Sequence, residues 1–201
     1  MKALLIIDMQ NDFMPGGPLG IDQADEIIPV INRLIDLFDN VYATKDWHPK
    51  NHVSFAAMHD KKINEEILIN QNIQRLWPDH CIQNTEGAKI VPNIRADKIE
   101  KIFYKGSDES VDSYSAFFDN NHERSTGLDL FLKERNIEDL YMVGVATDYC
   151  VKFSALDAHR LGFNVFIVKD ACMPVDKTGE KQVLLELEKK GIHLVSSEDL
   201  F

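Results

Sequence analysis

The hydrophobic positions along the chain follow two different periods. Residues 2–8 contain a continuous apolar run that ends in an acid, which is typical of a strand buried on both faces of a parallel sheet. From Ala24 to Phe38 the apolar residues instead recur every three or four positions, as on one face of a helix. Because Pro29 is tolerated only in about the first turn, this helix should begin near Asp25.

Further strands and helices alternate along the rest of the chain. The expected strands are 41–44, 99–104, 140–145, 164–168 and 192–195, and the expected helices are 128–135, 147–161 and 177–190. This alternation is typical of α/β proteins, so we predict a doubly wound sheet flanked by helices. A length of 201 residues favours one domain over residues 1–201.

Residues 46–95 are the exception to this alternation. This stretch of 50 residues contains no convincing strand. A long irregular stretch inside a compact domain is usually either a misassigned region or a functional loop. It carries four of the seven histidines, and we therefore interpret it as a functional loop.

Composition and charge argue against several classes of protein. The chain is 44% hydrophobic and 27% charged, as in ordinary globular proteins. Its net charge of −11 repels nucleic acid and anionic lipid, and no basic stripe offsets it. The longest apolar run, 140–146, is far shorter than the roughly 20 residues of a membrane span. Asp8 interrupts the first run too early for a signal peptide, so we expect a cytoplasmic protein.

The three cysteines differ in their surroundings. Cys81, Cys150 and Cys172 are odd in number and widely spaced, which argues against a disulfide framework or a thiolate zinc site. Residues 144–150 run from a predicted strand into a predicted helix, with Thr147 as a candidate N-cap. The first turn of a helix stabilises a thiolate and offers amide donors to an oxyanion. We therefore predict a reactive Cys150 with a depressed pKa, and structural roles for the other two.

Other candidate reactive groups follow the predicted strands. Asp8 ends the first strand, Asp46 follows the second, Lys105 follows the third, and Cys150 lies just past the fourth. Each residue alone is more often a cap, a solvated charge or a core residue. In an open parallel sheet, however, the carboxyl ends of the strands meet at one edge. The four together predict a site that contains a base, a cation and a thiol.

Asp46 and His48 are candidate ligands of a metal ion. Residues i and i+2 of an extended segment point the same way, so these two side chains can share one ion. His80, brought back by the long loop, would complete a set of one carboxylate and two imidazoles. That set suits zinc, iron or manganese, with positions left open for water or substrate. His52 could be a further ligand or a partner of one.

Six segments carry a further pattern, in the order 5–13, 44–49, 77–81, 105–108, 112–117 and 144–151. Together they resemble the nicotinamidases, or pyrazinamidases, of the isochorismatase-like cysteine hydrolase family. The resemblance extends over essentially the whole chain. It implies a Rossmann-like α/β fold with a mostly parallel sheet and a single domain. It also implies hydrolysis of nicotinamide to nicotinate and ammonia through a thioester, in the service of NAD salvage.

The same resemblance implies roles for individual residues. It implies a catalytic triad of Asp8, Lys105 and Cys150. It implies one divalent metal ion, with zinc expected first and iron or manganese as alternatives, held by Asp46, His48 and His80. A cis peptide is implied between Val145 and Ala146, and the amides of Ala146 and Cys150 are implied as oxyanion donors. Phe13, Trp77 and Tyr114 are candidates for an aromatic wall around the substrate ring, although simple core packing would also explain them.

Two alternative functions share part of this pattern. Relatives that act on isochorismate or carbamoyl amines have the same fold and triad but, as far as the resemblance goes, lack the metal set. A phosphoryl-accepting receiver domain would also place acids at strand ends, but it needs clustered acids after the first strand, where this chain has Met9 and Gln10. We therefore expect a small-molecule substrate, with no nucleic acid or membrane partner, and leave a homo-oligomer open.

Overall fold

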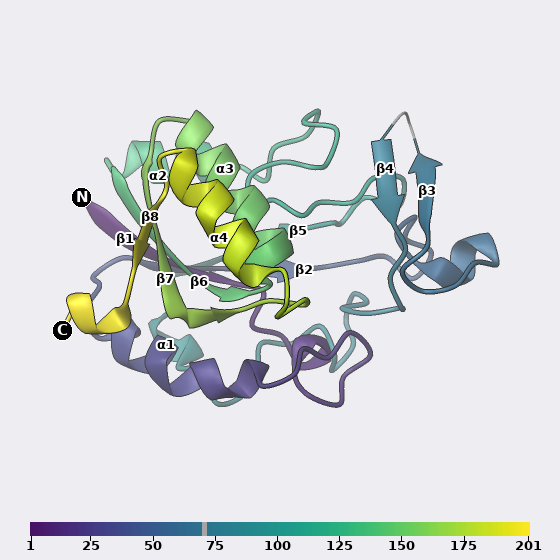
Figure 1. Ribbon diagram of the computed structural model, residues 1–201, viewed down its shortest axis with the longest axis horizontal. Helices are drawn as coiled ribbons and strands as arrows, with labels where there is room; N and C mark the ends of the chain where they lie inside the picture. The colour runs from purple at the N-terminus through teal and green to yellow at the C-terminus, as the bar shows by residue number, and fades with distance from the viewer. Residues whose placement is uncertain (70–71) are drawn as a thin grey trace.

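A six-stranded sheet forms the centre of the protein in the computed structural model, which describes residues 1–69 and 72–201 (Figure 1). The strand order is β5-β2-β1-β6-β7-β8, and every neighbouring pair is parallel. The strands are β1 (Lys2–Ile7), β2 (Val41–Asp46), β5 (Lys101–Lys105), β6 (Asp139–Val145), β7 (Asn164–Met173) and β8 (His193–Val195). The predicted doubly wound, mostly parallel α/β fold is confirmed.

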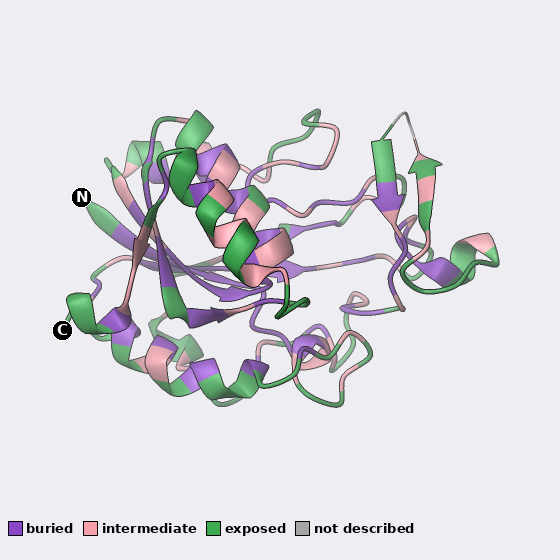
Figure 2. Cartoon of the chain, in the orientation of Figure 1, coloured by how far each residue is buried: buried purple, intermediate pink, exposed green. Residues whose placement is uncertain are grey.

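Helices cover both faces of this sheet, as Figure 1 shows. The helix α1 (Ile28–Ile35) packs on one face, where it shares a core with Leu4 and Ile6 of β1. The other face packs against α2 (Leu128–Glu134), α3 (Lys152–Arg160) and, through Leu187, α4 (Glu180–Lys189). Alternate residues of β1 therefore serve opposite cores, which explains its continuous apolar sequence. The central strands are buried almost throughout (Figure 2).

The order of the strands indicates where a ligand would bind. The chain runs outward from β1 through β2 to β5 in one direction, and from β6 through β7 to β8 in the other. The direction therefore reverses between β1 and β6, and ligands of open α/β sheets bind at the carboxyl ends of the strands at such a point.

A small second sheet lies within the long loop, where we expected no strand. The strands β3 (Glu66–Ile69) and β4 (Asn72–Arg75) pair antiparallel and stand apart from the main sheet (Figure 1). The expectation of a strandless 46–95 region is thus wrong. The paired residues Leu68 and Ile73 are both exposed, so this hairpin lacks the buried apolar face that reveals a strand in a sequence.

The predicted helix over 147–161 is divided into two parts. Residues Thr147–Val151 form a π-helical turn, and α3 follows it. The N-cap position is held by Ala146, so the prediction of Thr147 as the cap is wrong. The Thr147 hydroxyl instead contacts Glu180 Oε1 at 3.4 Å. The helix predicted near Asp25 does begin there, as a 3₁₀ turn over Ala24–Ile27 that leads into α1.

No helix among the described residues is long and apolar enough to cross a membrane.

Gly144 on β6 allows β6 to lie close to β1, and the order of the sheet reverses between these two strands. It pairs with Ile7 on β1, and its φ is 113°. A Cβ at this position would collide with the carbonyl oxygen of Ile7. A side chain is therefore excluded both by space and by backbone conformation.

We expect Gly144→Ala to destabilise the protein by about 3 kcal/mol or more, because a buried clash adds to an unfavourable φ. Gly162→Ala is the matched control, since Gly162 also has a positive φ of 92° but nothing lies within 4 Å of its Cβ position. That variant should lose only about 1 kcal/mol. Denaturant unfolding measures both values, and equal losses would contradict this explanation.

Candidate active site

Asp8, Lys105 and Cys150 meet at the carboxyl edge of the sheet. Asp8 follows β1, Lys105 ends β5, and Cys150 lies in the π turn after β6. Lys105 Nζ lies 2.9 Å from Asp8 Oδ2 and 3.3 Å from Cys150 Sγ. All three side chains are buried. The structure thus brings together a carboxylate, an ammonium group and a thiol at the carboxyl ends of three different strands.

Lys105 also contacts the candidate metal ligand Asp46. Its Nζ lies 2.5 Å from Asp46 Oδ1 and donates to the carbonyl oxygen of Ser113 at 3.0 Å. Burial disfavours the ammonium ion, but Asp46 and Asp8 outweigh that effect and hold the pKa of Lys105 well above its usual value. Lys105 therefore stays charged, as the cation of a buried cluster.

The ionisation of Cys150 differs from our expectation. Burial raises the pKa of the thiol well above its ordinary value; Lys105 opposes this shift, and Asp8 and Asp46 add to it. The predicted depression is wrong because the Cys150 thiol is buried near two carboxylates, and these effects outweigh the favourable start of a helix. A resting thiol of this kind needs a base. Asp8 is the nearest candidate, and burial raises its pKa too, despite Lys105.

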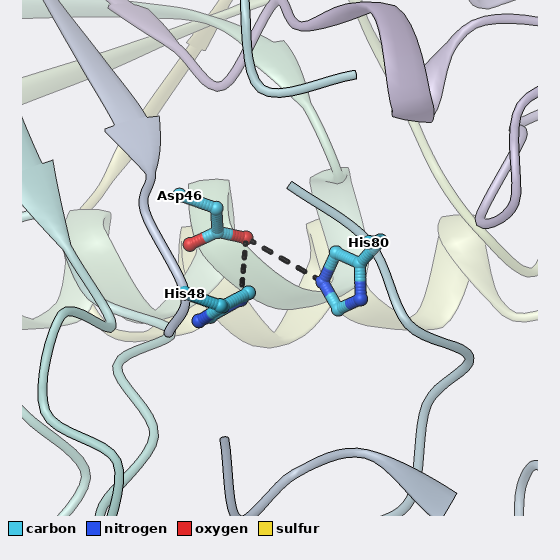
Figure 3. Close-up of side chains that lie close together, drawn as sticks. All are labelled: Asp46, His48 and His80. Carbon is cyan, nitrogen blue, oxygen red and sulfur yellow. Dashed lines mark ion pairs between the residues drawn. The ribbon is translucent and has the colours of Figure 1, made fainter. Parts of the chain in front are cut away.

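Asp46, His48 and His80 form the candidate metal site (Figure 3). Asp46 Oδ2 lies 3.6 Å from His48 Nε2 and 3.8 Å from His80 Nε2. The two oxygens of Asp46 thus have different partners, because Oδ1 faces Lys105. Burial opposes ionisation of Asp46, but Lys105 and His48 lower its pKa far below the usual value, so the carboxylate is charged.

The hydrogen bonds of the two histidines suit a metal ion. His48 Nδ1 lies 2.8 Å from the carbonyl oxygen of Gly106, and His80 Nδ1 lies 2.7 Å from that of Pro78. A carbonyl only accepts, so each Nδ1 carries the hydrogen and each Nε2 lone pair is free to bind an ion. Burial and His48 lower the pKa of His80 to about 4, which favours the neutral ligand, whereas Asp46 outweighs burial at His48 and raises the pKa of that imidazole.

The balance of charges also favours a metal ion at this site. With both carboxylates ionised, Asp8 and Asp46 face one ammonium group, so one negative charge remains in the buried cluster. A divalent cation would offset that charge. One carboxylate and two imidazoles are the open ligand set of catalytic zinc sites.

His52 is not directed toward Asp46. Its ring stacks on His48 with centroids 4.1 Å apart. Its Nδ1 contacts Ser54 Oγ at 2.7 Å, and its Nε2 lies 3.3 Å from the carbonyl oxygen of Val111. His52 therefore packs behind His48, although its ligand atoms also lie near those of His48 and Asp112.

A single cavity connects the Cys150 thiol with the candidate metal ligands. Its lining includes Cys150, the three candidate metal ligands and all three residues of the predicted aromatic wall, Phe13, Trp77 and Tyr114. Trp77 Nε1 donates to Tyr114 Oη at 3.2 Å. The peptide bond between Val145 and Ala146 is cis, as the resemblance implies, and Ala146 also lines the cavity.

The sequence did not single out several lining residues. They are Leu19, Ile21, Asp112, Tyr149 and Val175. The Tyr149 ring lies edge-on to Trp77 at 4.9 Å, and its hydroxyl accepts a hydrogen bond from Arg75 Nη1 of β4 at 2.9 Å. The position of Tyr149 next to Cys150 was a signal that could have found it.

The chain belongs to the isochorismatase family, because the isochorismatase domain matches residues 2–199. Its similarity to curated nicotinamidases identifies it as an amide hydrolase. It is 45% identical over 204 residues to the nicotinamidase of Escherichia coli (strain K12), covering 98% of this chain and 96% of that protein. It is 42% identical over 200 residues to the nicotinamidase of Acinetobacter baylyi, covering 98% and 94% of the two chains. The resemblance found in the six segments is thereby confirmed.

Solved structures extend the comparison. The Acinetobacter baumanii nicotinamidase/pyrazinamidase superposes with a TM-score of 0.96 at 44% identity, covering 100% of this chain and 98% of that one. The Pyrococcus horikoshii pyrazinamidase, solved in complex with zinc, has a TM-score of 0.81 at 36% identity, covering 97% and 98%. The yeast nicotinamidase bound to the inhibitor nicotinaldehyde has a TM-score of 0.93 at 32% identity, covering 98% and 100%.

We expect His80→Ala to weaken zinc binding more than His52→Ala, because His80 turns its Nε2 toward Asp46 and His52 does not. The loss at His80 should exceed the roughly 10–100-fold typical of an outer partner, and the loss at His52 should fall within or below that range. Equilibrium dialysis against zinc measures both affinities. A larger loss for His52→Ala would mean that the ion binds on the His52 side of His48.

Proposed function

We propose that this chain hydrolyses nicotinamide to nicotinate and ammonia, with Cys150 as the nucleophile and pyrazinamide as a second substrate. The observation that carries the proposal is one cavity lined by a buried thiol, two imidazoles with free Nε2 atoms and several aromatic side chains. An aromatic ring that bears both a ring nitrogen and a carboxamide matches these three kinds of group. The likeness to nicotinamidases at 42% and 45% identity supports the same substrate.

In the proposed reaction Asp8 takes the proton of Cys150, and Lys105 stabilises the thiolate. The sulfur attacks the carboxamide carbon, and the amides of Ala146 and Cys150 stabilise the oxyanion. Asp8 then gives its proton to the departing nitrogen, so that ammonia leaves and a thioester remains. Water, deprotonated by Asp8, attacks the thioester, and the proton returns to the sulfur as nicotinate leaves.

Asp46, His48 and His80 would hold a divalent metal ion, for which zinc is the first candidate and iron or manganese the alternatives. When bound, the ion would supply a Lewis acid for the pyridine nitrogen and so fix the orientation of the ring. Phe13, Trp77 and Tyr114 would flank the ring. We further propose that the product nicotinate serves NAD salvage in the cytoplasm.

Ammonia release from nicotinamide, with and without a chelator, tests this function. The proposal expects release by the parent protein, loss of release after chelation, and recovery when zinc is returned. An absence of release with metal present would refute the substrate. Full activity after verified removal of the metal would refute the role of the ion.

We expect Lys105→Met to lower kcat on the order of 100-fold or more with little change in KM, because the thiolate loses the ammonium group that lies 3.3 Å from its sulfur. Lys101→Met is the matched control, since Lys101 lies on the same strand but is exposed and remote from Cys150. Steady-state kinetics on nicotinamide measure both variants. A normal kcat for Lys105→Met would remove Lys105 from the reaction.

The proposed contact with the ring nitrogen predicts an order of substrates. Pyrazinamide keeps a nitrogen in the same relation to the carboxamide and should be hydrolysed. Benzamide has only a C–H group at that position and should be a very poor substrate, although its amide is chemically similar. Ammonia release from each compound by the zinc-loaded protein provides the measurement. Equal rates for benzamide and nicotinamide would refute the orienting role of the ion.

A further inference from the structure

The hydroxyl group of Thr44 on β2 contacts Asp8 at two points. Thr44 Oγ1 donates to Asp8 Oδ1 at 2.7 Å, and the backbone amide of Asp8 donates to the same Oγ1 at 3.3 Å. Thr44 is 1% exposed and Asp8 is 0% exposed, so bulk water does not compete for either bond. One side chain therefore restrains both the backbone and the carboxylate of Asp8.

Asp8 has a conformation that needs such support. Its φ is 50°, in the left-handed region that residues with a side chain seldom adopt. It lies directly after the last residue of β1, where the sheet no longer fixes the backbone. The Thr44 hydroxyl provides the amide of Asp8 with an acceptor at this point.

The bond to Oδ1 also decides which oxygen of Asp8 is left for Lys105 and Cys150. Lys105 Nζ lies 2.9 Å from Oδ2, but Oδ2 has no aligned hydrogen-bond donor among residues 1–69 and 72–201. Ligand atoms of Asp8, Asp46 and Cys150 lie within 4.8 Å of one another. With Oδ1 occupied by Thr44, Oδ2 is the oxygen available to the Cys150 thiol.

We propose that Thr44 is a positioning residue that directs Asp8 Oδ2 toward Cys150. In the step that it assists, the S–H bond of Cys150 breaks, an O–H bond forms on Asp8 Oδ2, and the electron pair stays on sulfur. The inference deepens the proposed function and rests on it for the choice of nicotinamide as substrate.

Gln10 provides a contrast that isolates this role. Gln10 binds Asp46 through the backbone alone, since its Nε2 donates to Asp46 O at 2.8 Å and its Oε1 accepts from Asp46 N at 2.8 Å. Gln10 thus holds the backbone of Asp46, whereas Thr44 holds Asp8. Of these two side chains, Thr44 is the one that contacts a carboxylate oxygen.

Steady-state kinetics of two substitutions test the proposal. Thr44→Val keeps the shape but removes the hydroxyl, and it should lower kcat at least about tenfold with KM changed less than about twofold. Thr44→Ser restores a hydroxyl and should keep kcat within about threefold of the parent. Thr126→Val is the matched control and should leave kcat unchanged, because the Thr126 hydroxyl also donates once and accepts once but contacts Ala116 and Leu128 instead. A normal kcat for Thr44→Val, or an equal loss in Thr44→Ser, would overturn the proposal.

Alkylation of Cys150 by iodoacetamide gives a readout that does not need turnover. The thiolate displaces iodide, so the rate at Cys150, followed by peptide mass spectrometry, reports proton transfer to Asp8. Thr44→Val should slow the alkylation of Cys150 when it is introduced into the parent protein. It should not slow the alkylation further when it is introduced into the Asp8→Asn variant. An unchanged rate for Thr44→Val in the parent protein would overturn the proposal. A parent protein that is alkylated as expected but releases no ammonia would refute the proposed function alone.

If Thr44→Val does not fold, Thr44→Ala replaces it. Misfolding of both variants would assign the hydroxyl to folding and overturn the proposal.

Discussion

The buried ammonium group of Lys105 is the contact on which the rest of the site depends. It lies between Asp8 and Asp46 and within 3.3 Å of the Cys150 sulfur. Removing a charge from water costs several kcal/mol, and the two carboxylates and the Ser113 carbonyl offset that cost in the cluster. The order of the parallel strands makes the cluster possible, because it brings the ends of β1, β2 and β5 side by side.

The same cation links two parts of the site that have different chemistry. One oxygen of Asp46 faces Lys105 and the other faces His48 and His80, so a single carboxylate joins the thiol side to the imidazole side. The cavity borders both sides, and aromatic side chains line it. A substrate that is anchored at one end is thereby presented to the sulfur at the other, which is the general advantage of a preorganised site.

Much of this arrangement could be predicted from the sequence, because simple rules govern it. The carboxyl ends of parallel strands converge, which predicted Asp8, Lys105 and Cys150, and the two-residue repeat of an extended chain predicted Asp46 with His48. The β3–β4 hairpin was missed because Leu68 and Ile73 on it are exposed. The pKa of Cys150 was misjudged because burial near two carboxylates is a property of the folded site. Thr44 could have been found, since it lies two residues before Asp46 and so points to the same side of β2.

The central claim is that Cys150 carries the acyl group during turnover. Rapid mixing of the zinc-loaded protein with nicotinamide, followed by an acid quench and peptide mass spectrometry, tests this claim most directly. The account predicts a nicotinoyl group on the peptide that contains Cys150, which appears before ammonia release reaches steady state and is absent in Cys150→Ala. A nicotinoyl group on Cys81 or Cys172, or steady turnover by Cys150→Ala, would contradict it.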